Sequence, residues 1–156
     1  MYPPDLIRAA RELASANKGK PVQAYLHRAT STAYYALFHT LARSCADMLV
    51  GTQSAKRSKP AWRQVYRALN HGKARERCKA SMIQKFPQGI QDFANMLVSM
   101  QAKRHDADYN PDHRAFKSAV ITDIDAVEVA IADYEAVDAK DRRAFAVWML
   151  IEDRKS

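Results

Sequence analysis

The chain has 156 residues, of which only 4 are glycine, and its 25 Lys and Arg against 17 Asp and Glu give a formal net charge of +8. This length fits one domain with a substantial hydrophobic core, and the composition favours helix over sheet. No apolar run approaches the roughly 18 residues that span a membrane, and the N-terminus lacks a signal-peptide pattern. We therefore expect a soluble, cytoplasmic protein rather than a membrane-inserted or secreted one.

The first third of the chain predicts two helices. Pro4 suits an early helical position and Gly19 suits a left-handed cap, so a first helix is expected over residues 4–16. Pro21 then opens a long second helix that runs to about Val50.

The middle of the chain predicts a short helix, a break and a long helix. Ser58 is typical of a helix start, and residues 70–72 (Asn-His-Gly) are typical of a stop. A short helix is expected over 73–80. Pro87 then starts a long helix that ends near Asp108.

The last third predicts a turn and two further helices. Residues 109–112 (Tyr-Asn-Pro-Asp) favour a turn. One helix is expected over 113–136, and Asp138 is expected to cap another over 139–152. Since alternating runs of β-branched residues are absent, the sequence predicts an all-α, antiparallel up-and-down bundle of four or five main helices in a single domain, 1–156.

The long helix that ends near Asp108 carries an unusual stripe. Helical spacing places five side chains on one face: Phe93, Leu97, Met100, Arg104 and Asp108. The stripe is apolar for two turns and then becomes charged. A charge on a buried stripe costs stability unless it is paired, and such places are often functional.

The second helix carries a matching polar row. Four side chains fall close together on one face: Arg28, Thr32, Tyr35 and His39. Tyr34 and Phe38 make the middle of this helix apolar nearly all round. A helix of this kind lies at the centre of its bundle or is covered by a partner, so we expect the polar row to be covered.

The charge is unevenly distributed along the chain. Residues 1–104 have a net charge of +13 and residues 105–156 a net charge of −5. Nine basic residues opposed only by Glu76 form the densest patch: Lys56, Arg57, Lys59, Arg63, Arg67, Lys73, Arg75, Arg77 and Lys79. Trp62, Tyr66 and His71 are interleaved with them, which suits stacking on RNA bases. The alternatives are a solvated helix face, or docking to the acidic C-terminal part of this chain or of a second copy.

Several polar residues also have a purely structural interpretation. His39 is then a satisfied interior side chain, His105 a surface residue, and Tyr109 an anchor for the turn. Asp123 lies on the apolar stripe of the 113–136 helix, where it is alternatively the buried partner of Arg104 or Arg28. Cys45 and Cys78 have no metal-ligand spacing and are expected to be reduced, packed thiols.

Two segments together resemble the HEPN superfamily of small helical proteins. One is Arg28 to His39 with its Ala-Tyr-Tyr-Ala-Leu-Phe-His core, and the other is Arg104 followed by Ala-Asp-Tyr at 107–109. The match covers roughly residues 5–135. It implies an antiparallel four-helix bundle with extra short helices, usually a homodimer. Many members are metal-independent endoribonucleases of toxin–antitoxin, defence or RNA-processing systems, and others are non-catalytic RNA-binding or accessory proteins.

The resemblance also implies roles for individual residues. Family nucleases pair an arginine with a histidine a few residues away, and two copies form one composite site. Arg104 carries over as the motif arginine, with Asp108 beside it. The histidine spacing departs from the family pattern, because His105 follows at once and His113 is nine positions on. His39 or His105 would therefore move protons, oriented by Tyr35 and Tyr109. The expected RNA-binding residues are Arg28, Tyr35, Arg57, Arg63, Arg67, Lys73 and Arg75.

No metal or other cofactor is expected, because no His, Cys, Asp and Glu cluster has ligand spacing. Expected partners are a second copy, RNA, and a cognate antitoxin or a nucleotidyltransferase-type protein. The rival interpretation is a non-enzymatic interaction protein in which Arg104, Asp108 and Asp123 form a buried ionic network. A nucleotide-binding accessory subunit is a third.

Overall fold

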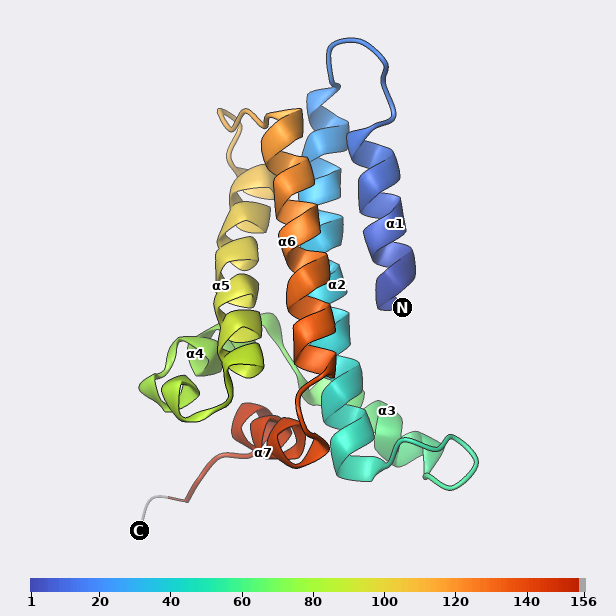
Figure 1. Ribbon diagram of the computed structural model, residues 1–156, viewed down its shortest axis with the longest axis vertical. Helices are drawn as coiled ribbons and strands as arrows, with labels where there is room; N and C mark the ends of the chain where they lie inside the picture. Colours follow the sequence, from blue (N-terminus) through green and yellow to red (C-terminus); the bar gives the residue numbers. More distant parts are fainter. Residues whose placement is uncertain (155–156) are drawn as a thin grey trace.

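Four long helices form the body of the protein in the computed structural model, which describes residues 1–154. They lie side by side and alternate in direction along the chain (Figure 1). They are α1 (Pro3–Ala14), α2 (Gln23–Val50), α5 (Gln88–Tyr109) and α6 (Lys117–Glu135). The described part of the chain contains no strand, which confirms the all-helical fold class.

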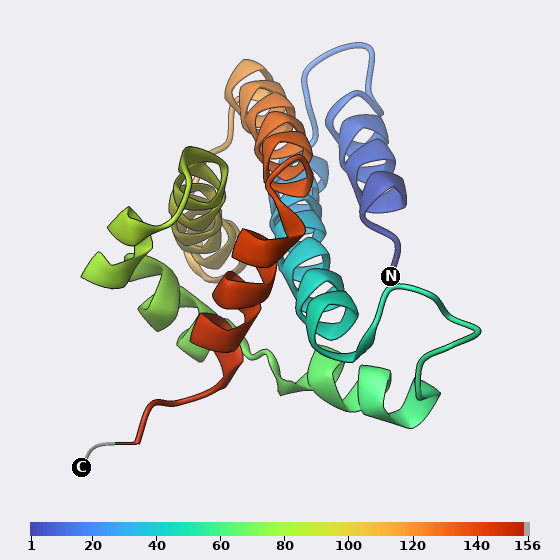
Figure 2. The ribbon, with the colours of Figure 1, turned by 60° about the horizontal axis from the view of Figure 1, so that its bottom comes forward.

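The remaining helices lie across one end of these four (Figures 1 and 2). They are α3 (Lys59–Ala68), α4 (His71–Lys79), the 3₁₀ helix η1 (Ser81–Lys85) and α7 (Ala139–Leu150). Helix α4 packs against α5 and α7, and α3 packs against α2. None of the helices over residues 1–154 is both long and apolar enough to cross a bilayer.

Helix α2 is the centre of the bundle. It packs against α1, α3, α5, α6 and α7. One face of α2 is buried throughout and consists of Leu26, Ala29, Ala33, Leu37, Thr40, Leu41 and Ser44. The small residues on this face let the neighbouring helices approach closely. The expectation of a central helix is therefore confirmed.

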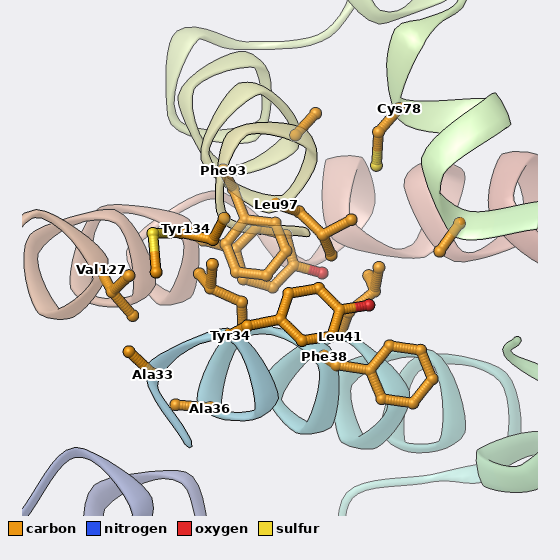
Figure 3. Close-up of a cluster of buried hydrophobic side chains, with 14 of the residues drawn as sticks. Ala33, Tyr34, Ala36, Phe38, Leu41, Cys78, Phe93, Leu97, Val127 and Tyr134 are labelled. Atoms are coloured by element: carbon orange, nitrogen blue, oxygen red, sulfur yellow. The ribbon is translucent and has the colours of Figure 1, made fainter. Parts of the chain in front are cut away.

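Aromatic side chains fill the core where α2, α5 and α6 meet (Figure 3). Phe93 and Tyr134 are fully buried with ring centroids 4.5 Å apart. The Tyr134 hydroxyl lies 2.6 Å from the Ser44 hydroxyl, so this buried polar atom has a partner. The apolar half of the predicted α5 stripe is therefore core, as expected. Phe116 falls within the predicted 113–136 helix, but it precedes α6 and is 65% exposed.

Side-chain caps mark the starts of two helices, α3 and α4. Ser58 accepts a hydrogen bond from the backbone N–H of Ala61, as predicted for the start of α3. Asn70 accepts one from the N–H of Lys73, so it starts α4 as well as following the end of α3. Asp138 precedes α7, but its side chain makes no capping bond, which corrects the expectation.

Helix α6 begins later than the predicted residue 113. The side-chain amide of Gln23 binds both backbone groups of Ala115, donating to its carbonyl at 2.9 Å and accepting from its N–H at 2.8 Å. These bonds hold the segment before Lys117 in a non-helical conformation against the start of α2. A contact between residues so distant in the chain leaves no local sequence signal.

The start of α5 approaches the end of α6 closely at Gly89. A Cβ added there would lie 2.6 Å from Val137 Cγ2 and 2.9 Å from the carbonyl oxygen of Asp133. Such distances are inside van der Waals contact, and one of the two atoms belongs to the backbone.

We expect Gly89→Ala to lower the free energy of unfolding by about 1–3 kcal/mol through overpacking. Gly72→Ala is the matched control, because Gly72 is also the second residue of its helix and the nearest atom to an added Cβ is 3.9 Å away. Thermal unfolding of both variants measures the difference. Equal stability of the two would contradict the close approach.

Candidate functional site

Arg104 of α5 binds the aromatic face of α2. Its Nη2 donates a hydrogen bond to the Tyr35 hydroxyl at 3.1 Å. The centre of its guanidinium lies 5.7 Å from the Tyr34 ring centroid and 5.5 Å from that of Tyr35, within range of cation–π attraction. Only 18% of the side chain is exposed. The charged end of the stripe on α5 therefore packs against α2, within the segment from Arg28 to His39.

Asp108 provides a counter-charge to Arg104. Its Oδ2 lies 3.2 Å from Arg104 Nε, one helical turn away, while its Oδ1 accepts a 2.6 Å hydrogen bond from the Ser31 hydroxyl of α2. Arg104 Nε is buried and has no acceptor in hydrogen-bond geometry within residues 1–154. The distance qualifies as an ion pair, but the carboxylate makes its aligned hydrogen bond with Ser31 rather than with Arg104 Nε.

His71 of α4 completes the cluster. Its Nδ1 lies 2.6 Å from the Tyr34 hydroxyl, and its ring stacks on Phe38 with centroids 4.0 Å apart. Its backbone carbonyl accepts a hydrogen bond from Gln101 of α5. Burial, reinforced by the charge of Arg104, lowers the pKa of His71 and keeps its ring neutral. From the sequence we expected His71 to stack on RNA bases. No sequence signal indicated that it lies near Arg104.

An open hollow of about 610 Å³ lies beside this cluster. Its lining residues are Arg75, Gln101, Ala102, Arg104, His105 and Asp106. Arg75 and His105 are exposed, so both can reach a ligand there. Two guanidinium groups suit a phosphate, and an imidazole can transfer protons near neutral pH. The hollow thus combines charge and proton-transfer chemistry.

His39 does not join the hollow. Its Nδ1 is hydrogen-bonded to the Tyr66 hydroxyl of α3, and burial lowers its pKa. Its ring lies 6.2 Å from that of Tyr35. The polar row of α2 is therefore covered where α3 crosses it, as expected, but His39 faces α3 rather than Arg104.

Of the other candidates near the end of α5, His105 and Tyr109 face solvent. Tyr109 is 65% exposed, and its ring centroid lies 4.9 Å from that of His105. His113 Nδ1 lies 3.1 Å from Asp106 Oδ2. Asp123 was a candidate partner of Arg104 or Arg28, and this is wrong: its carboxylate accepts a 2.7 Å hydrogen bond from Lys103. Asp108, on the same helix as Arg104, takes the role instead.

The basic patch of residues 56–79 divides into an exposed part and an engaged part. Six of its side chains are exposed: Lys56, Lys59, Arg63, Arg67, Arg75 and Lys79. Arg57 is engaged, because it binds Asp47 at 2.9 Å. Lys73 pairs with Glu152 at 3.3 Å. On α2, Arg28 is exposed.

The aromatic residues within the patch turn inward. Trp62 donates its indole N–H to Asp47, Tyr66 contacts His39, and His71 stacks on Phe38. All three rings pack against α2 and are only partly exposed, which limits the area that they offer to RNA bases. The expected stacking stays a prediction, and the exposed basic side chains form the main feature of the outer face.

Both cysteines are buried free thiols, as expected, and burial raises the pKa of each to about 12. Within residues 1–154 no three or more His, Cys, Asp and Glu side chains are grouped to hold a metal ion. Comparisons with protein family models, with curated proteins and with solved structures gave no match.

The lowered pKa of His71 makes stability depend on pH. The unfolded chain takes up the proton at about pH 6.5, whereas the folded chain resists it, so the free energy of unfolding falls as the pH drops below that value. We expect the Tm to decrease from about pH 7 to 5, and to decrease less steeply in His71→Asn. His105→Asn, at an exposed position, is the control. Equal pH slopes for His71→Asn and wild type would contradict the buried neutral ring.

Proposed function

We propose that this chain is an RNA-binding protein of the HEPN type, in which the hollow beside Arg104 binds the phosphate backbone. The contact of Arg104 with Tyr35 carries the proposal, because it joins the two segments on which the resemblance rests. The bundle of α1, α2, α5 and α6 agrees with the architecture that the resemblance implies. Arg75 adds a second, exposed guanidinium at the same hollow.

The exposed part of the basic patch supports the same function. Arg63 and Arg67 are exposed and line an open depression on α3. Because unpaired surface cations attract the RNA backbone without regard to sequence, this face would guide RNA toward the hollow. The inward-facing rings make phosphate contacts, rather than base stacking, the main source of affinity.

A homodimer is part of the proposal. Three large apolar groups are exposed where α2 begins, α5 ends and α6 begins: Tyr25, Tyr109 and Phe116. These three ends lie together at one end of the bundle (Figure 1). A second copy that covers them would bring a second Arg104 and His105 near the first.

Metal-independent cleavage of RNA is the second candidate, and His105 favours it. This imidazole lines the same hollow as both arginines, whereas His39 is engaged with Tyr66. His105 would take the proton from the ribose 2′-hydroxyl, which attacks the phosphorus, and a second acid or water would protonate the departing 5′-oxygen. Arg104 would stabilise the charge that develops on the phosphate oxygens.

RNA binding is tested with Arg75→Gln, at a position exposed enough to leave the fold intact. We expect weaker binding and a slope of log Kd against log salt that is smaller by about one phosphate contact. Arg8→Gln is the matched control, since Arg8 is exposed on α1 and pairs with Asp5. Fluorescence anisotropy with a labelled single-stranded RNA measures both. An unchanged slope in Arg75→Gln would exclude the hollow, and no binding by wild type would exclude the function.

Cleavage is tested by incubating the protein with mixed cellular RNA in EDTA. If the chain is a nuclease, His105→Asn should reduce the rate at least a hundredfold, on the order of a general acid–base contribution. The His39→Asn variant should retain cleavage. If the RNA stays intact but is retarded on a gel, the binding function stands and the enzymatic function is excluded.

A further inference from the structure

The charges around the hollow are balanced. This balance affects which kind of phosphate group the hollow can bind. Arg75 and Arg104 contribute two positive charges, while Asp106 and Asp108 contribute two negative ones. The hollow therefore differs from a purely cationic phosphate site. Two of these charges, Arg104 and Asp108, are mostly shielded from solvent, with 18% and 27% of their side chains exposed.

The position of Asp108 is fixed from the opposite helix. Ser31 is 1% exposed and lies in the middle of α2, where a serine hydroxyl usually bonds to its own helix or to solvent. Here it donates to Asp108 Oδ1 at 2.6 Å instead. The carboxylate lies beside Arg104 but makes no aligned hydrogen bond with its Nε. Arg104 also lines the hollow, where its guanidinium can contact a ligand.

We propose that Asp108 makes this site selective for internal phosphodiesters over terminal phosphates. An internal phosphodiester carries one negative charge, and a terminal phosphate carries close to two above about pH 7. The cost of removing an ion from water rises with the square of its charge, whereas attraction rises only in proportion. Where positive and negative side chains are balanced, the second charge of a dianion is attracted by Arg104 but also repelled by Asp108. The two effects offset each other.

This inference rests on the proposed function and names its substrate class. The ligand is the interior of an RNA strand, recognised through monoanionic phosphates, rather than a free nucleotide or a strand end. Asp108 is then a specificity-determining residue that does not contact the phosphorus. The rival ligand, a mononucleotide, would need a site with excess positive charge.

Asp108→Asn tests this directly, because the amide keeps an acceptor for Ser31 and removes only the charge. The full chain binds a labelled single-stranded RNA, and two competitors displace it at pH 8: adenylyl-adenosine, with one phosphodiester, and adenosine monophosphate, with one terminal phosphate. Wild type should prefer the dinucleotide. In Asp108→Asn the ratio of the two inhibition constants should move toward the monophosphate by about fivefold, the effect of one partly screened charge.

Two further variants separate charge from structure. Asp92→Asn, an exposed carboxylate on the same helix that accepts from Gln88, should leave the ratio unchanged. Ser31→Ala frees Asp108 without removing its charge and should change the ratio less than Asp108→Asn does. If RNA binds but Asp108→Asn leaves the ratio at the wild-type value, the selectivity inference is wrong and the binding function stands. If wild type binds no RNA, both are wrong.

Discussion

The burial of one arginine between two helices is the constraint on which the rest of the structure depends. Arg104 lies against Tyr34 and Tyr35 of α2, and its charge is balanced by Asp108 from its own helix. A partly buried cation needs a counter-ion and hydrogen bonds, and the two aromatic rings add cation–π attraction, so this contact restricts the rotation of α5 about its axis relative to α2. The same rotation buries Phe93 and Leu97 in the core and places the neighbouring His105 at the hollow.

The fold was largely predictable because helix signals are local. Caps such as Ser58 and the periodic burial of α2 and α5 are properties of short windows of sequence, and the structure follows them. The late start of α6 was not predictable, because it depends on Gln23 binding a backbone segment far along the chain. The exposed position of Phe116 follows from the same displacement.

The site was predictable only in part. The spacing of Arg104 and Asp108 along one helix indicated an unusual pair, and the aromatic residues of α2 indicated where it would pack. Ser31 and His71 gave no comparable signal, because a serine inside an alanine-rich helix and a histidine before a glycine are common in ordinary surroundings. Their roles come from contacts between α2, α4 and α5 that no single window contains. The inward turn of Trp62 was missed for the same reason.

If the proposed function is correct, RNA phosphate reaches Arg104 in the hollow. NMR tests this through the side-chain Nε–H signal of each arginine in ¹⁵N-labelled protein during titration with a short single-stranded RNA. We predict that the signals of Arg104 and Arg75 shift in a saturable manner. The signal of Arg11, which is held by Asp125 and Glu128, should stay in place. Shifts confined to Arg63 and Arg67 of α3, with Arg104 unchanged, would contradict this prediction.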